Sequence, residues 1–137
     1  MTEGWYFDDY LVLLSLAERS RAAENYRLAE YLPDSELLGL RNWDDFILRS
    51  HSGEVFCAPT VPLCGKYSSP YSLPESRELT PDSRIAGKIK WYVKPLIFGG
   101  SATEPANTAW VSHEQHAQLV VWWNEQYQSL ASASSAA

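Results

Sequence analysis

SHEQHAQLVVWWNEQYQSL, residues 112–130, is the stretch that decides the predicted fold. Ser112 is a favourable N-cap, and Gln115 three residues later completes a capping box. Behind this start signal, apolar and aromatic side chains recur at spacings of three and four residues, which is one face of a helix. The recurring positions are His116, Leu119, Val120, Trp123, Tyr127 and Leu130. We therefore predict a long C-terminal helix onto which the other elements fold.

A chain of 137 residues is long enough for one domain with a substantial core. Because no repeat or composition break divides it, we predict a single domain over residues 1–130 and a flexible, Ala- and Ser-rich tail over residues 131–137. The longest apolar run, residues 10–14, is too short to cross a membrane, and residues 1–5 lack the basic start of a signal peptide. We expect a cytoplasmic protein without a membrane partner.

The N-terminal segment, residues 6–31, has an apolar pattern that fits a helix. Phe7, Tyr10, Leu11 and Leu14 follow one another at helical spacing, and Pro33 would end the element. We therefore expect one helix here, or two if Ser20 breaks it, followed by an irregular piece over residues 34–39.

The middle of the chain predicts strands. Residues 43–61 read as a β-hairpin, because Ser-Gly separates two apolar, β-favouring runs. Residues 62–84 contain four prolines and read as an ordered surface loop. Residues 85–98 alternate apolar and mostly lysine positions, and residues 108–111 form a short strand before the last helix. The predicted class is α+β, with N-terminal helices, a central, mostly antiparallel sheet of three to five strands, and the long C-terminal helix.

Candidate catalytic and metal-binding groups are few. His113 and His116 stand three residues apart, without the zinc-protease spacing or an obvious third ligand. We expect His116 at the edge of the core and His113 in solvent. Asp44, Asp45 and Glu54 could form an acid–base site, but adjacent strand residues point to opposite faces. Gly99 and Gly100 predict a turn, and Cys57 and Cys64 predict two reduced thiols. We therefore predict no enzyme, no metal and no cofactor.

Charge is unevenly distributed along the chain. Residues 1–45 hold ten acidic residues and four arginines, a net charge of −6, which argues against a nucleic-acid partner. An acidic surface with exposed aromatic side chains instead suits a basic protein partner. The residues predicted to contact that partner are Trp5, Asp8, Asp9, Glu18, Glu24, Asp44, Asp45 and Trp122. Trp122 belongs to this set because it points away from Trp123 on the predicted helix.

Four stretches taken together resemble a known family: residues 40–46 (LRNWDDF), 58–63 (APTVPL), 86–100 (AGKIKWYVKPLIFGG) and 107–124. In that order they are similar to small bacterial immunity proteins of the SUKH kind. Those proteins neutralise toxins, including toxins delivered by type VI secretion or contact-dependent systems. The resemblance implies an α+β domain without a cofactor that binds a cognate protein toxin and occludes its active site. The acidic bias would then match a toxin with a basic active-site cleft.

Two other functions fit the same sequence. A non-catalytic adaptor or chaperone for a secreted effector would use the same acidic and aromatic surface. An enzyme would need the His113–His116 pair or the Asp44–Asp45 pair as its site.

Overall fold

The computed structural model describes the backbone of residues 1–136 and the side chains of residues 1–131. The strands are β1 (Thr2–Tyr6), β2 (Asp9–Leu13), β3 (Glu36–Arg41), β4 (Asp45–Arg49), β5 (Val55–Pro59), β6 (Ser69–Pro70), β7 (Ile89–Tyr92) and β8 (Thr108–Val111). The α-helices are α1 (Leu16–Asn25) and α2 (His113–Ala136). Short 3-10 helices lie at Leu28–Glu30, Gly65–Tyr67, Ser76–Glu78, Leu96–Phe98 and Pro105–Asn107.

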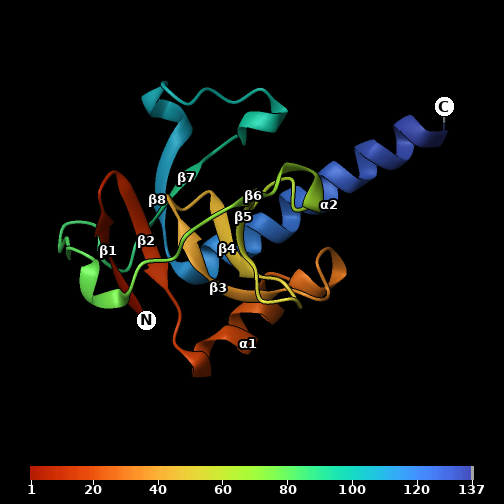
Figure 1. Cartoon of the computed structure of the whole chain (residues 1–137). Coiled ribbons are helices and arrows are strands. Elements are labelled where there is room, and N and C mark those ends of the chain that lie inside the picture. Colours follow the sequence, from red (N-terminus) through yellow and green to blue (C-terminus); the bar gives the residue numbers. More distant parts are fainter. Residues whose placement is uncertain (137) are drawn as a thin grey trace.

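The first six strands form one antiparallel sheet in which spatial order follows sequence order, from β1 to β6. α1 lies in the connection between β2 and β3, and β7 pairs with β8 as a separate two-stranded sheet. α2 crosses the sheet and extends beyond it (Figure 1). The predicted α+β class and long C-terminal helix are confirmed. The predicted count of three to five strands is wrong, because the described chain contains eight.

One of the strands that the sequence did not predict, β2, lies where it predicted a helix, and the end of β1 lies there too. The segment from residue 6 to residue 31 begins with the β1–β2 hairpin, and α1 starts only at Leu16. There the backbone N–H of Ser15 donates to Glu18 Oε1 at 2.8 Å, which is half of a capping box. α1 ends at Asn25, ahead of Arg27 in the left-handed region (φ 53°), so Pro33 does not set its end. Glu36–Arg41, predicted to be irregular over most of its length, is β3.

Burial of the sheet on both faces explains this error. On one face Tyr10, Val12 and Phe46 pack with α1, α2 and β7 in the larger core cluster. On the other face Leu11 and Ile47 pack in a second cluster beneath the loop that contains Leu79. A strand with both faces buried is apolar at consecutive positions, and such a run also matches helical spacing.

α2 begins as the sequence predicted. The Ser112 hydroxyl accepts from the backbone N–H of Gln115 at 3.1 Å, and Gln115 Oε1 accepts from the backbone N–H of Ser112 at 3.0 Å. The helix continues to Ala136, into the segment predicted to be a flexible tail. The mobility of that tail stays a prediction, and Ala137 lies outside the described residues.

Two polar residues on α2 are buried and bonded to other elements. Asn124 accepts from the backbone N–H of Leu63 and donates to the backbone carbonyl of Thr60, both at 2.8 Å, so it fastens the loop after β5 to the helix. His116 is fully buried, and its Nδ1 lies 2.6 Å from the hydroxyl of Tyr26. The predicted position of His116 at the core edge is therefore wrong. The helix enters the core at its first turns, so His116 lies at the centre.

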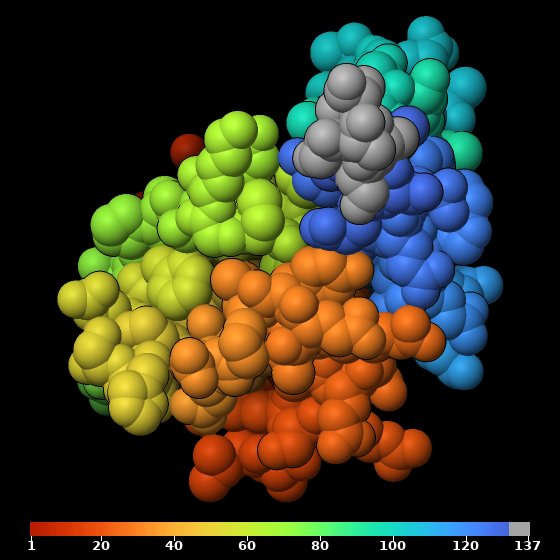
Figure 2. Space-filling view, turned by 90° about the vertical axis from the view of Figure 1, so that its right-hand side faces the viewer, coloured from red at the N-terminus to blue at the C-terminus, as the bar shows by residue number. Residues whose placement is uncertain are grey.

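The two helices lie side by side on the same face of the sheet. Arg27 just after α1 forms an ion pair with Glu125 of α2 at 3.1 Å. Figure 2 shows the orange segment that follows α1 in contact with the blue helix. Ala22 of α1 packs against the larger core cluster to which Val120 of α2 belongs, so the N-terminal and C-terminal parts of the chain share one core.

The remaining predictions for the middle of the chain are largely confirmed. β4 and β5 form the predicted hairpin, and residues 62–84 run as a mostly extended loop that contributes β6. β7 buries Ile89 and Trp91 as the alternation predicted. β7 ends at Tyr92, however, and Val93 is exposed because the chain turns into a loop. Asn107 closes this loop by accepting from the backbone N–H of Lys94 and donating to the Lys94 carbonyl. No helix of the described residues is long and apolar enough to cross a membrane.

We predict that His116 makes stability depend on pH. Burial first, and then the neighbouring His113, lower the pKa of His116 from 6.5 to about 3, while the Trp43 backbone acts in the opposite direction. Between pH 6.5 and pH 3, His116 therefore binds a proton in the unfolded chain but not in the folded chain. The free energy of unfolding should fall as pH drops from about 6.5 towards 3, by up to about 1.4 kcal/mol per pH unit from this group.

Urea denaturation of the wild type and of His116→Gln at several pH values measures this contribution. His116→Gln should be less stable at pH 7 by about 1–3 kcal/mol, because the Tyr26 hydroxyl loses its buried partner. Its stability should also fall less steeply between pH 6 and 4. Equal slopes for the two proteins would refute the assignment.

Candidate functional site

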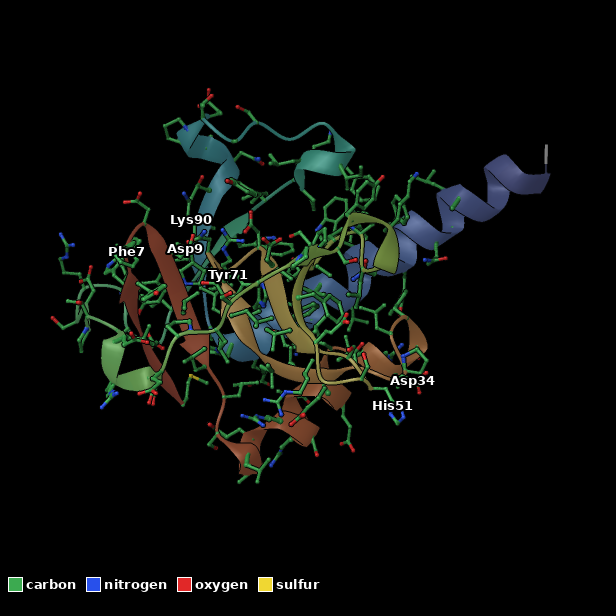
Figure 3. All side chains as sticks on the ribbon, viewed as in Figure 1. Phe7, Asp9, Asp34, His51, Tyr71 and Lys90 are labelled. Carbon is green, nitrogen blue, oxygen red and sulfur yellow. The ribbon has the colours of Figure 1, made fainter. Side chains whose placement is uncertain are left out.

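Two turns and the end of β5 lie at one end of the six-stranded sheet. The β1–β2 turn contains Phe7 and Asp8, and the β3–β4 turn runs from Asn42 to Asp44. The two turns lie together because β2 and β3, which lead from one turn and into the other, are paired, with Leu11 opposite Arg41. Asp45 pairs with Pro59, so the end of β5 lies beside them. We call this region the hairpin end; its residues are Phe7, Asp8, Asp9, Asn42, Trp43, Asp44 and Asp45. Figure 3 shows Phe7 and Asp9 on one side of the molecule and His51 on the opposite side.

The backbone at the hairpin end adopts an uncommon conformation. Phe7 (φ 53°), Asn42 (φ 50°) and Trp43 (φ 64°) are three of the four non-glycine residues with positive φ in the described chain. This region suits Asn or Gly, but it costs other L-residues about 1–2 kcal/mol each. Phe7 and Trp43 therefore destabilise the two turns, and other contacts must offset that cost.

Asn42 supplies those contacts. Its backbone N–H donates to the Tyr10 carbonyl at 2.7 Å, and its Oδ1 accepts from the Tyr10 N–H at 2.9 Å. Its Nδ2 also donates to Asp9 Oδ1 at 2.9 Å. These three hydrogen bonds hold the two turns in fixed relative positions.

An aromatic layer supports the turns from the larger core. Tyr10 stacks on Trp43 with ring centroids 4.9 Å apart, and Trp5 meets Tyr10 edge-on at 5.1 Å. Trp43 also meets Trp110 of β8 at 5.2 Å. Trp43 is nearly buried, whereas Trp110 is 45% exposed. Trp5 is half-buried, and its Nε1 donates to Asp82 at 3.1 Å. The aromatic layer therefore reaches the surface at Trp110.

The carboxylates at the hairpin end differ in their partners. Asp9 forms an ion pair with Arg41 at 3.1 Å and accepts from the Tyr71 hydroxyl at 3.4 Å. Asp8 is exposed, and no ion pair within 4.0 Å is found for it among residues 1–131. The free carboxylate of Asp8 therefore faces solvent at the tip of the β1–β2 turn.

Asp44 and Asp45 line a small cleft of about 170 Å³ beside the hairpin end. Its other walls come from the end of β5, from β7 with Lys90 and Tyr92, and from Pro95 and Leu96. Asp44 is exposed as a whole residue, but atoms crowd its carboxylate on the side of the cleft. This desolvation, followed by repulsion from Asp45, raises the pKa of Asp44 to about 6. Desolvation likewise raises the pKa of Asp45, while Arg41 lowers it. The cleft is therefore electrostatically unfavourable for its own carboxylates at neutral pH, as is common at functional sites.

The predicted contact residues divide into two groups. Trp5, Asp8, Asp9, Asp44 and Asp45 gather at or beside the hairpin end. The remaining residues, Glu18, Glu24 and Trp122, lie elsewhere, on α1 and α2. The expected acidic N-terminal helix is therefore wrong, because Asp8 and Asp9 belong to a turn and a strand rather than to α1.

The structure adds site residues that the sequence did not indicate. The helical spacing predicts a buried helix position for Phe7, so it gives no sign that the ring is exposed. The pattern around Trp110 predicts only a short strand. Asn42 carried the one usable signal, because Asn tolerates positive φ, and the two residues after it are Trp43 and Asp44.

Some of the other candidate chemical groups lie apart from one another. Glu54 lies in the turn at the opposite end of the β4–β5 hairpin from Asp45, so it does not join Asp44 and Asp45. The expectation that Asp44 and Asp45 point to opposite faces is wrong, because both line one cleft and Asp44 precedes the strand. Within residues 1–131, no group of three or more His, Cys, Asp or Glu side chains could hold a metal ion. His113 is half-buried rather than solvated, and burial lowers its pKa.

A second hollow lies between α1, the start of α2 and the sheet. This groove has a volume of about 660 Å³, an apolar floor that includes Val12 and Leu40, and polar groups from Glu18, Arg21 and His113. Its size falls within the range of ligand sites. The groove lies beside the Thr2 end of β1, because Glu18 and Val12 line it, whereas the hairpin end adjoins Tyr6.

Comparisons with known proteins found no match to the chain among family models, characterised proteins or solved structures. The functional interpretation therefore rests on the sequence and on the geometry of the hairpin end.

We predict that removing the charge of Asp44 stabilises the protein. The folded pKa of about 6 exceeds the ordinary value of 3.8 for an aspartate, so the folded state binds more protons between these values and loses stability as pH rises through them. Asp44→Asn should raise the melting temperature at pH 7.5, and the gain should vanish below about pH 4.

Thermal melts of wild type and Asp44→Asn across this pH range measure the effect, and carboxyl NMR measures the pKa directly. In Asp45→Asn, the pKa of Asp44 should fall, because the repelling neighbour is gone. A wild-type Asp44 that titrates near 4 would contradict the described environment.

Proposed function

We propose that this protein binds another protein and inhibits it without catalysis, as an immunity protein that neutralises a cognate bacterial toxin by covering the toxin's active site. One observation carries the proposal: Phe7 is 84% exposed at the tip of a hairpin, in a left-handed conformation, beside an unpaired carboxylate. Exposed, strained aromatic residues reduce stability and contribute little to folding, but they are effective anchors at protein interfaces.

Charge at the hairpin end suggests what kind of surface the partner has. Asp8, Asp9, Asp44 and Asp45 stand against two nearby cations, Arg41 and Lys90, which leaves a net charge of −2 when all are ionised. The whole chain carries −6. A toxin whose active-site cleft is basic, such as one that handles nucleic acid or nucleotides, would be attracted to this surface.

The resemblance to SUKH immunity proteins supports the same function. Such an immunity protein would act in the cytoplasm of the cell that makes it. Its target would be a toxin that competing bacteria deliver through type VI secretion or a contact-dependent system. It would need no cofactor, because inhibition requires only that the toxin's active site be covered.

A second candidate function is an adaptor or chaperone for a secreted effector. The groove of about 660 Å³ between α1 and α2 favours this alternative, because its apolar floor could hold a segment of an effector. The two functions differ in outcome, since a chaperone stabilises its effector without abolishing the effector's activity.

We predict that the protein rescues cells that express the toxin encoded by the neighbouring gene, and that purified protein inhibits this toxin at one-to-one stoichiometry. Asp8→Lys and Asp44→Lys should each weaken binding about tenfold or more, mainly through slower association at low salt. Glu24→Lys makes the same charge change on α1, away from the hairpin end, and serves as the matched control. Asp9 is avoided because it is bonded to Arg41 and Asn42.

Surface plasmon resonance at 50 and 500 mM salt measures these rates. If Glu24→Lys slows association as much as Asp8→Lys does, the contact face is not the hairpin end. If the neighbouring protein stays active when bound, the adaptor function replaces the immunity function.

A further inference from the structure

We infer that Phe7 is the anchor of the interface: the partner presents an apolar socket that receives the Phe7 ring, bordered by lysine or arginine side chains that meet Asp8 and Asp44. This inference rests on the proposed function and adds the residue and the chemistry by which the partner is recognised.

The first support is the lack of an internal role for the Phe7 ring. The described chain gives it one ring contact, edge-on to Tyr6 with centroids 4.8 Å apart. The other aromatic residues near the hairpin end, Trp5, Tyr10 and Trp43, pack in the larger core cluster and support the fold. Phe7 therefore keeps its apolar surface in water in the free protein.

The second support is that the position of Phe7 is set before binding. Asn42, in the β3–β4 turn, forms hydrogen bonds with Asp9 and Tyr10 at the start of β2. These bonds fix the strand that directly follows the turn containing Phe7. An aromatic side chain on a fixed turn loses little conformational entropy on binding, and this small entropic cost favours affinity. Asn would suit the positive φ of Phe7 better, so the aromatic ring is kept at a cost in stability.

The third support is the charge around the Phe7 ring. Asp8 is its neighbour in sequence, and Asp44 lies in the adjoining turn. Arg41 is held by Asp9 at 3.1 Å, and it does not neutralise Asp8. A socket with an apolar centre and a basic border matches this arrangement, since apolar contact supplies affinity and the charges supply orientation and association rate.

The test uses the full-length protein and the purified toxin encoded by the neighbouring gene. Phe7→Asn should raise the melting temperature, because Asn suits the turn, while weakening binding about 30-fold or more. Leu16→Asn is the matched control: Leu16 is 77% exposed on α1, and its loss should change binding less than twofold. Binding of Phe7→Asn within threefold of wild type would overturn the inference.

Salt dependence and crosslinking test the socket's chemistry. The effect of Phe7→Asn should be similar at 50 and 500 mM salt, whereas the effect of Asp8→Lys should shrink at 500 mM. A benzophenone amino acid at position 7 should crosslink to an apolar toxin segment that has lysine or arginine within a few residues. Crosslinks to an acidic segment would overturn the inference.

Failure of the inference is distinguishable from failure of the proposed function. If wild type neither binds the toxin nor rescues cells, the proposed function fails, and the inference fails with it. If wild type rescues cells and Phe7→Asn rescues them equally well with unchanged affinity, only the inference fails.

Discussion

Burial of the six-stranded sheet on both faces governs the rest of this structure. Phe46 packs against the helices on one face, and Ile47, its neighbour in sequence, packs beneath the loop of residues 62–84 on the other. The loop must therefore stay ordered, and it does so through β6 and through a backbone bridge between Thr80 and Trp5 at the outer edge of β1. This bridge also covers part of an edge strand that would otherwise be open to pairing with other chains.

Because both faces of the sheet are covered, the turns at its two ends are its exposed parts, and the two ends differ. At the end opposite the hairpin end, the β4–β5 turn follows ordinary rules, with Gly53 at positive φ. At the hairpin end, Phe7 and Trp43 occupy positions that favour Asn or Gly, and Asp44 sits where its charge is unfavourable. Several local costs collected in one region, and offset by the bonds of Asn42, are typical of a site kept for function rather than for stability.

The aromatic layer links this site to the core. Trp43 lies between Tyr10 below it and Trp110 beside it, so the β3–β4 turn is packed against both sheets. α2 packs against the same core, where His116 meets Trp91 of β7, so the turns rest on a core built from both ends of the chain. A rigid support is what an interface anchor requires, since binding then costs little ordering.

The sequence by itself determined those elements whose signals are local. The Ser112–Gln115 capping box, the Ser-Gly turn between β4 and β5, and the alternation of Ile89 and Trp91 each act through neighbours along the chain, and each is confirmed. In the sequence only their charge distinguishes Asp8, Asp9, Asp44 and Asp45, and the sheet brings them together. Only the tertiary structure decided that residues 9–13 form a strand, that His116 is central, and that Phe7 is exposed. The physical reason is that a strand covered on both faces has no period-two pattern. Whether such a segment forms a strand depends on the strands and core residues that it contacts, which lie far along the chain. The exposure of the turn beside it depends on the same contacts.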